Sequence, residues 1–245
     1  MKLKKTFAAL LVGAMILTGC SSSPKETKET KTEEKKESTK KPIKYAMVTD
    51  TGGVNDQSFN QSAFEGLKDL EKEGIIEKAS YVESKQASDY KTNLETLLDT
   101  KYDLIAGIGF ALAKDIEAAA KANPDQKYVI IDSAFENTPK NLIGTIFADN
   151  ENSFLVGYLA GTLTTSNKVG FIGGITSPLI KKFEAGFRAG VELAAKDNNK
   201  TVEVVAQYAE SFGDATKGKA IANSMYSSGV DMIFHASGGT GNGVI

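Results

Sequence analysis

The sequence predicts an α/β protein built on parallel β-sheets, and two observations support this. Beyond residue 42, short runs rich in β-branched residues alternate with segments whose apolar residues recur at helical spacing. This alternation is typical of βαβ units, in which a helix returns the chain to begin the next parallel strand. The composition agrees, because 41% of the 245 residues are hydrophobic and 24% are charged, as in ordinary globular proteins.

Eight strands and six helices follow from the pattern. The strands are expected at 43–49, 79–83, 103–108, 127–131, 142–147, 168–172, 202–206 and 231–235. The helices are expected at about 58–73, 88–99, 111–122, 152–165, 179–196 and 213–228. In the first helix, Ser58 and Gln61 predict a capping box, and Gly74 supplies a stop signal.

The strands divide into two groups, which predicts two lobes. Five strands precede the segment near residue 150, so 43–150 is expected to form lobe 1, and 151–245 a crossover and part of lobe 2. The last strand runs into a glycine-rich segment at 238–243 with no covering helix after it. We therefore expect a second lobe that is incomplete in this chain, truncated at its C-terminus, and weaker ligand binding than in a complete protein.

The first twenty residues are typical of a bacterial lipoprotein signal. Lys2, Lys4 and Lys5 precede an apolar run at 6–17, which is too short to span a bilayer. Residues 17–20, Leu-Thr-Gly-Cys, resemble a lipobox, in which cleavage leaves Cys20 as the lipidated N-terminus. The sequence thus predicts a signal peptide at 1–19 and a palmitate-bearing lipoprotein on the extracytoplasmic face of the cell membrane.

A polar tether follows Cys20. Residues 21–41 contain seven Lys, five Glu, four Ser, four Thr and one Pro, and no apolar side chain. Such a segment has nothing to bury, so 20–42 is expected to be a disordered spacer between the lipid and the folded part. The 29 basic and 31 acidic residues of the whole chain leave a net charge of −2, so no nucleic-acid partner is expected.

Catalytic and cofactor motifs are weak. The single cysteine excludes disulfide frameworks and cysteine-built metal sites. Gly107 and Gly109 lack the third glycine of a dinucleotide loop, and 238–243 lacks the Lys-Ser/Thr pair of a P-loop. His235, the only histidine, lies in an apolar strand, which favours an interior imidazole over a metal ligand or general base. We expect no cofactor and no metal.

One block of residues is specific enough to indicate a family. The segment at 50–63 reads D-T-G-G-V-N-D-Q-S-F-N-Q-S-A and directly follows the first strand. It resembles the basic membrane protein family, the purine nucleoside receptor lipoproteins of bacterial ABC importers. Further matching blocks are V-I-I-D at 129–132, S-F-L-V-G at 153–157, K-V-G-F-I-G-G at 168–174, F-E-A-G-F-R-A-G at 183–190 and G-G-T-G at 238–241.

The resemblance implies a type I periplasmic-binding-protein-like fold, with two Rossmann-like lobes that close on a nucleoside without reaction. The chemistry of the residues is compatible with such a site. Asp50 and Asp132 follow strands one and four, at the strand ends where open α/β sheets bind ligands. Asp56 and Asn60 can hydrogen bond a purine edge, and Phe59 can stack on its face. Asp50 and Asp56 could instead cap turns, and Ser58 is expected to cap the helix more than to bind ligand.

The second aromatic face is expected from lobe 2. Phe183 and Phe187 lie four residues apart and therefore on one side of a helix. One is expected in the core and the other in the cleft, with Phe183 preferred for the cleft. Gly239 of the glycine-rich segment is a further candidate for ligand contact.

The leading function is therefore capture of a purine nucleoside (adenosine, guanosine or inosine) for delivery to an ABC permease. One alternative is a receptor for a sugar or another small solute in the same fold. Another is a cell-surface nucleoside-processing enzyme, such as a hydrolase, with Asp50 and Asp56 holding a metal.

Overall fold

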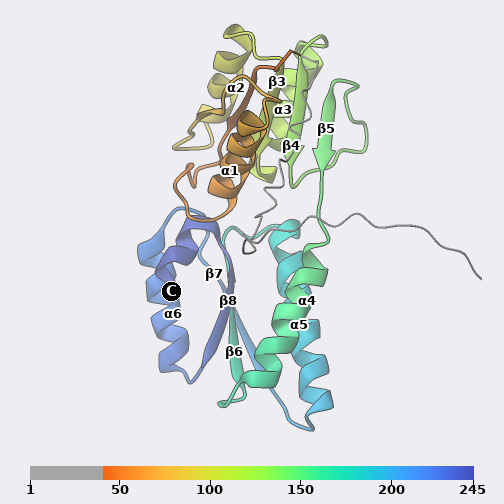
Figure 1. The fold of residues 1–245 in the computed structure, drawn as a ribbon. Coiled ribbons are helices and arrows are strands. Elements are labelled where there is room, and N and C mark those ends of the chain that lie inside the picture. The colour runs from red at the N-terminus through yellow and green to blue at the C-terminus, as the bar shows by residue number, and fades with distance from the viewer. Residues whose placement is uncertain (1–40) are drawn as a thin grey trace, which may run out of the picture. The chain divides into compact units, whose positions relative to one another are not determined.

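The computed structural model describes residues 41–245 of the chain (Figure 1). The predicted signal peptide, Cys20 and nearly all of the predicted tether lie outside the described residues. Residues 41–245 belong to one unit by their contacts. Within residues 41–245, no helix has the length and apolar character needed to cross a membrane.

The first sheet has five strands in the order β2-β1-β3-β4-β5, all parallel. Its strands are β1 (Tyr45–Val48), β2 (Ser80–Val82), β3 (Leu104–Ile108), β4 (Lys127–Ile131) and β5 (Leu142–Thr145). Its helices are α1 (Phe59–Lys72), α2 (Asp89–Asp99), the 3-10 turn η1 (Phe110–Leu112) and α3 (Ala113–Ala122). We call this part of the chain the first lobe.

Helices cover both faces of the first sheet because its strands carry apolar side chains on both sides. Ala46 and Val48 pack with Leu94 of α2 and Ile116 of α3. Met47, between them in sequence, joins the core beneath α1 on the opposite face. Alternation of side chains along a strand therefore explains the two cores. The chain moves from β1 to β2 on one side and then to β3 on the other, so the topological switch point lies between β1 and β3. Open α/β sheets bind ligands in the crevice at the carboxyl ends of these two strands.

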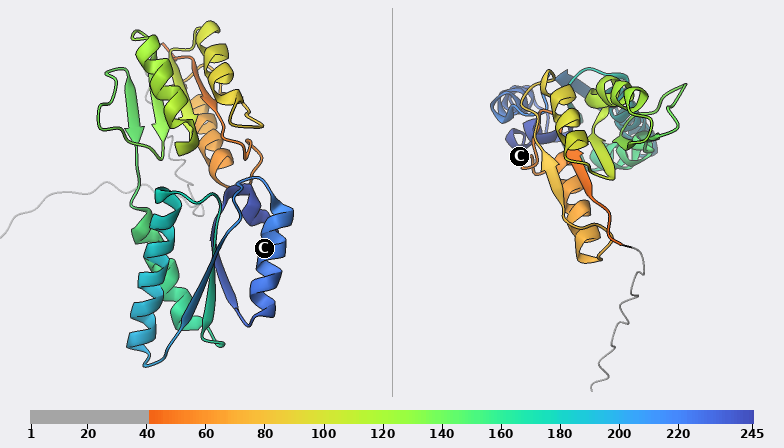
Figure 2. Two further views of the ribbon diagram at one scale, coloured as in Figure 1. Left: turned by 180° about the vertical axis from the view of Figure 1, so that it is seen from behind. Right: turned by 90° about the horizontal axis from the view of Figure 1, so that it is seen from above.

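The second sheet has three parallel strands in the order β7-β6-β8. The elements are α4 (Asp149–Leu163), β6 (Lys168–Gly173), α5 (Pro178–Asp197), β7 (Glu203–Tyr208), α6 (Ala215–Ser227), β8 (Met232–Ala236) and the 3-10 segment η2 (Gly238–Gly243). We call this part the second lobe. Figure 2 shows α4 and α5 on one side of this sheet and α6 on the other.

Glycines bring α4 and α5 unusually close. A Cβ atom at Gly157 would lie 2.0 Å from the carbonyl oxygen of Phe187, and one at Gly190 would lie 2.0 Å from that of Phe154. Only residues without a side chain permit this approach. The helix pair then covers Phe171 of β6 with Phe187 and Val191 of α5.

The predicted fold class is confirmed: the protein is an α/β protein with parallel sheets and a partial second lobe. Every expected strand and helix is present, and none of their bounds moves by more than three residues. The predicted stop at Gly74 is confirmed, because α1 ends at Lys72 and Gly74 has a φ of 71°.

The predicted capping box at Ser58 is wrong. Ser58 is the N-cap residue of α1, but its side chain makes no capping hydrogen bond. The carboxylate of Asp56 takes that role, accepting from the backbone N–H groups of Ser58, Asn60 and Gln61 at 2.9–3.0 Å. A carboxylate two residues earlier reaches more of the free N–H groups than the serine hydroxyl can.

Candidate functional site

A cavity of about 390 Å³ lies where the ends of the first-lobe strands meet the end of β8. Residues of both lobes line it: Asp50, Asp56, Ser58, Phe59, Asn60, Ser62, Gly109, Phe110, Asp132, Leu179, Ile180, Phe183, Phe212, Phe234, His235, Ala236, Ser237 and Gly238. The structure thus brings seven of the predicted site residues together: Asp50, Asp56, Ser58, Phe59, Asn60, Asp132 and Phe183. This volume is in the range of small-molecule sites.

Asn60 connects the two carboxylates of the β1–α1 loop. Its side-chain nitrogen donates to Oδ1 of Asp50 at 2.7 Å and to Oδ2 of Asp56 at 3.0 Å. Its side-chain oxygen accepts from the backbone N–H of Asp50 at 3.2 Å. All three residues are at most 6% exposed. Asn60 therefore holds the two acids in place, and its polar atoms are already occupied within the protein.

Asp50 keeps one oxygen available for a ligand. Its Oδ1 accepts from Asn60 and from the backbone N–H of Gly52 at 2.8 Å. Its Oδ2 has no protein donor among residues 41–245 and lies beside Gly109 at the cavity wall. Burial raises the pKa of Asp50, while the hydrogen bonds from Gly52 and Asn60 oppose that rise. Asp50 thus presents one fixed acceptor to the cavity.

Asp56, in contrast, is used by the protein on both oxygens. Oδ1 accepts from the N–H groups of Ser58 and Gln61, and Oδ2 accepts from the backbone and side chain of Asn60. The capping role considered for Asp56 from the sequence is therefore what the structure shows. Within the described part of the chain, no group of three His, Cys, Asp or Glu side chains could hold a metal ion.

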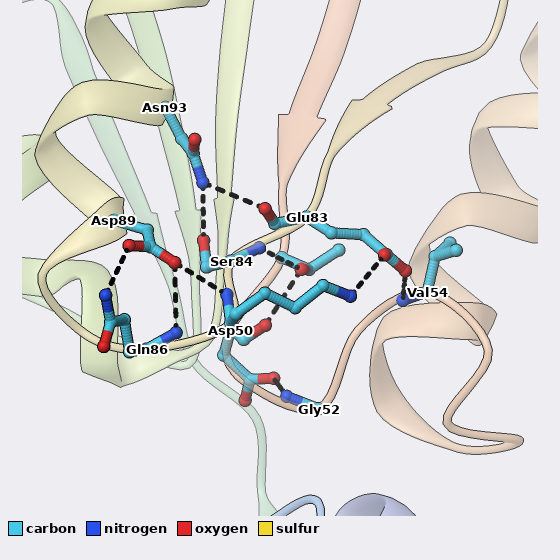
Figure 3. A network of polar contacts seen from close by, with 10 residues as sticks. Asp50, Gly52, Val54, Glu83, Ser84, Gln86, Asp89 and Asn93 are labelled. Atoms are coloured by element: carbon cyan, nitrogen blue, oxygen red, sulfur yellow. Dashed lines mark hydrogen bonds and ion pairs between the residues drawn. The ribbon is translucent and has the colours of Figure 1, made fainter.

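A polar network behind the site fixes the β1–α1 loop (Figure 3). Glu83, after β2, accepts from the backbone N–H of Val54 at 2.9 Å, which holds the pKa of Glu83 below its ordinary value. Asn93 of α2 donates to the carbonyl of Glu83 and to the hydroxyl of Ser84. Ser84 in turn donates its N–H to Thr49, next to Asp50. The sequence pattern does not indicate Glu83, because its partner Val54 lies 29 residues away.

Phe59 lies at the first turn of α1 with its ring against Gly109. A Cβ at Gly109 would be 3.3 Å from Cε1 of Phe59 and 3.5 Å from Oδ2 of Asp50. Gly109 has a φ of 104°, a conformation that residues with side chains rarely adopt. The glycine therefore leaves room beside the Phe59 ring and the free oxygen of Asp50, both of which line the cavity.

Further aromatic rings reach the cavity from the second lobe. Phe183 lines it, as preferred from the sequence, together with Phe212 and Phe234. Phe110 of the first lobe meets Phe212 edge to face, with ring centroids 6.2 Å apart. Phe110, Phe212 and Phe234 were not predicted, since nothing in their local sequence distinguishes them from core aromatics.

Two predicted site residues do not line the cavity. Phe187 is fully buried in the second-lobe core, 5.4 Å from Phe234 between ring centroids. The four-residue spacing places it on the same side of α5 as Phe183, but one turn deeper under the sheet. Gly239 is buried as well, and a Cβ there would lie 3.4 Å from the Cβ of Asp56, so it contacts the first lobe instead of the cavity.

Asp132 follows β4 at the cavity with a φ of 63°. Burial raises its pKa to about 6; the negative charge of Asp149 adds to the rise and Lys182 opposes it. Lys182 forms an ion pair with Asp149 at 3.1 Å and also donates to the carbonyl of Phe147. The protonation of Asp132 therefore changes at about pH 6.

His235 also lines the cavity, although the sequence indicated an interior imidazole. Its side chain packs against Gly241, where a Cβ atom would lie 2.0 Å from Cε1. Its Nδ1 is 3.3 Å from the hydroxyl of Ser237, and burial lowers its pKa, so the ring is neutral at pH 7. The imidazole of His235 therefore packs against Gly241 and also lines the cavity.

Parallel strands in two lobes, with a cavity at their carboxyl ends, form the kind of site at which open α/β sheets bind a small solute. The chain belongs to the family of ABC transporter substrate-binding proteins described as PnrA-like, whose model matches residues 43–245. The expected resemblance to the basic membrane protein family is confirmed. The family consists of substrate-binding components and not of enzymes, which agrees with the expectation that no reaction is catalysed.

Curated relatives are similar along most of the chain. A CD4+ T-cell-stimulating antigen of Listeria monocytogenes is 45% identical over 249 residues, which cover 98% of this chain and 67% of the relative. An ABC transporter nucleoside-binding protein of Lactococcus lactis is 43% identical, covering 97% of this chain and 65% of the relative. Basic membrane protein A of Borreliella burgdorferi is 38% identical, covering 82% of this chain and 58% of the relative. The chain thus spans about two thirds or less of the length of these relatives.

Among solved structures, a solute-binding protein of an ABC transporter system from Aeropyrum pernix is similar with a TM-score of 0.77 and 28% identity. The match covers 83% of this chain and 58% of that one. A solute-binding protein from Conexibacter woesei, at 23% identity and a TM-score of 0.61, shows the same fold.

Proposed function

We propose that the protein captures a purine nucleoside (adenosine, guanosine or inosine) and delivers it to an ABC permease. The observation that carries this proposal is the pairing of Phe59 with the free oxygen of Asp50 at Gly109. A flat base stacked on Phe59 would place its edge within reach of Asp50. Phe183 and Phe212 offer aromatic surface from the second lobe. The Lactococcus lactis relative, named for nucleoside binding, supports the same ligand class.

The charge of the cavity supports a ligand without phosphate groups. Its lining among residues 41–245 contains three aspartates and no lysine or arginine. A nucleotide would bring negative charge next to Asp50 and Asp132, which costs free energy in a partly buried site. A nucleoside has hydrogen-bond donors for these oxygens and no charge.

Isothermal titration calorimetry with a panel of compounds tests the ligand class. Inosine, guanosine and adenosine are expected to bind, whereas ribose alone and inosine 5′-monophosphate are expected to bind at least tenfold more weakly. Equal affinity for ribose would instead support the sugar receptor. Conversion of inosine to hypoxanthine and ribose during the titration would support the enzyme alternative.

The site of action is part of the proposal. We propose that residues 1–19 are removed, that Cys20 carries the lipid, and that 20–42 tethers the two lobes, 43–150 and 151–245, to the outer face of the cell membrane. A polar tether has no other means of attachment, so Cys20→Ala is expected to release the protein from membranes washed with high salt. A variant that stays in the membrane fraction would contradict the lipid anchor.

A further inference from the structure

We infer that Asn242 is a latch between the two lobes, which sets how long a captured ligand stays bound. The inference rests on the proposed function for its ligand, but its geometry is independent of which ligand binds. The latch is the hydrogen bond from the side-chain nitrogen of Asn242 to the backbone carbonyl of Asp56, at 2.9 Å. The donor belongs to η2 of the second lobe and the acceptor to the β1–α1 loop of the first.

The acceptor side of the latch is rigid. The carboxylate of Asp56 caps α1 through the N–H groups of Ser58 and Gln61, and Asn60 holds it from the side. The carbonyl of Asp56 therefore has a fixed position relative to Asp50 and Phe59, the residues proposed to hold the base. A hydrogen bond to this carbonyl therefore fixes the second lobe relative to the proposed base-binding residues.

The donor side is also braced. The Thr240 hydroxyl accepts from the backbone N–H of Asp214 at 2.9 Å and donates to the carbonyl of Ser211 at 2.9 Å. The N–H of Thr240 donates to the carbonyl of Phe212. These bonds join the loop at 211–214 to η2. Phe212, which lines the cavity, and Asn242 therefore move together with the second lobe.

Glycines let these loops approach the first lobe. A Cβ at Gly213 would lie 3.3 Å from the carbonyl oxygen of Thr51, and one at Gly239 would lie 3.4 Å from the Cβ of Asp56. Side chains at these positions would press against the β1–α1 loop. The backbone of these second-lobe loops thus lies against the β1–α1 loop of the first lobe. Asn242 adds a side-chain hydrogen bond across that contact.

This geometry predicts an effect on release and not on capture. The lobes must separate before a ligand enters, so the latch is open during capture. It is closed while the ligand is bound and must break before the ligand leaves. Asn242 is exposed, so replacing its side chain leaves the cores intact. Loss of one hydrogen bond is expected to raise the dissociation rate about two- to tenfold. The association rate is expected to stay within about twofold of the original protein.

The experiment measures release of radiolabelled inosine after a chase with excess unlabelled inosine. Asn242→Ala is compared with Asn223→Ala, which changes an exposed asparagine of α6 that makes no hydrogen bond through its side chain within residues 41–245. A second variant, Gly213→Ala, adds a methyl group against Thr51 and is expected to speed release as well. Melting temperatures without ligand are expected to agree among all four proteins within about 2 °C.

The outcomes separate the latch from the proposed ligand. Faster release in Asn242→Ala and Gly213→Ala, but not in Asn223→Ala, supports the latch, and equal rates in all variants overturn it. If the original protein binds no inosine, the proposed ligand is wrong, and small-angle X-ray scattering without ligand then tests the latch. A larger radius of gyration in Asn242→Ala than in Asn223→Ala would support it, and equal radii would overturn it.

Discussion

Asn60 and Asp50 form a reciprocal pair, in which the side-chain nitrogen of Asn60 donates to Oδ1 of Asp50 and its oxygen accepts from the backbone N–H of Asp50. Both residues are buried, Asp50 just after β1 and Asn60 in the first turn of α1. The pair turns Oδ2 of Asp50 towards the cavity. Asn60 was predicted from the sequence to contact the ligand. These hydrogen bonds instead indicate that Asn60 positions Asp50.

Asn60→Ala is therefore expected to lower both stability and inosine affinity. Two buried carboxylates lose their shared donor, which costs about 1–3 kcal/mol of unfolding free energy. Urea unfolding measures this cost, and Asn223→Ala serves as the surface control. An Asn60→Ala protein with unchanged unfolding and unchanged affinity would show that the pair does not position Asp50.

Phe59→Ala tests the stacking face. We expect inosine binding to weaken by about 1–3 kcal/mol, because the base loses an aromatic surface. The matched control is Phe64→Ala on the same helix, whose ring packs against Tyr81 at 4.8 Å and does not line the cavity. Calorimetry and thermal melting are measured on both variants. If Phe64→Ala loses as much affinity as Phe59→Ala, the loss is due to stability and not to stacking.

Gly109→Ala is expected to impair both folding and binding. At a φ of 104°, any side chain is strained by about 1–3 kcal/mol, and the added methyl group would also crowd Phe59 and Asp50. Gly66→Ala in α1 is the control, since its Cβ meets nothing within 4 Å and alanine favours helices. Thermal melting should fall for Gly109→Ala and stay equal or rise for Gly66→Ala. The opposite order would contradict the role assigned to Gly109.

Asp132 predicts a pH dependence of both stability and binding. Its pKa in the folded protein, about 6, lies above that of an unfolded aspartate, so the folded state binds the proton more tightly. Asp132 therefore destabilises the protein above about pH 6, and this destabilisation disappears as the pH falls towards 4. Asp132→Asn should have a higher melting temperature at pH 7.5 than the original protein, and the gap should close near pH 4.

Binding should respond in the opposite direction. If the ionised Asp132 accepts a hydrogen bond from the ligand, inosine affinity in the original protein falls as the pH drops from 7 to 5. The Asp132→Asn variant should bind more weakly at pH 7 and show a flatter pH profile. Identical profiles in both proteins would remove Asp132 from the site.

The fold was easier to predict from the sequence than the site was. Alternating strand and helix patterns located all the strands, because each buries apolar residues on a regular period. The loop block at 50–63 located Asp50, Phe59 and Asn60, but not their roles. Which atoms of Asn60 are free depends on distances to Asp50 and Asp56 that spacing alone does not give.

The second-lobe side of the site was hardest to predict. Phe183 and Phe187 share one helix side, and only the depth of α5 against the sheet puts Phe187 in the core. Phe212 and His235 reach the cavity because β7 and β8 end there, which depends on the order of the strands. In the first lobe, Glu83 was missed for a similar reason, since its contact with Val54 joins segments far apart in sequence.

Native mass spectrometry of the protein mixed with equal amounts of inosine, guanosine, adenosine, ribose and inosine 5′-monophosphate tests the central proposal most directly. We predict one bound nucleoside per protein, released unchanged on unfolding, and much less of that adduct in Phe59→Ala than in Phe64→Ala. A protein that retains none of the nucleosides, or that retains ribose or the monophosphate in preference to them, would contradict nucleoside capture.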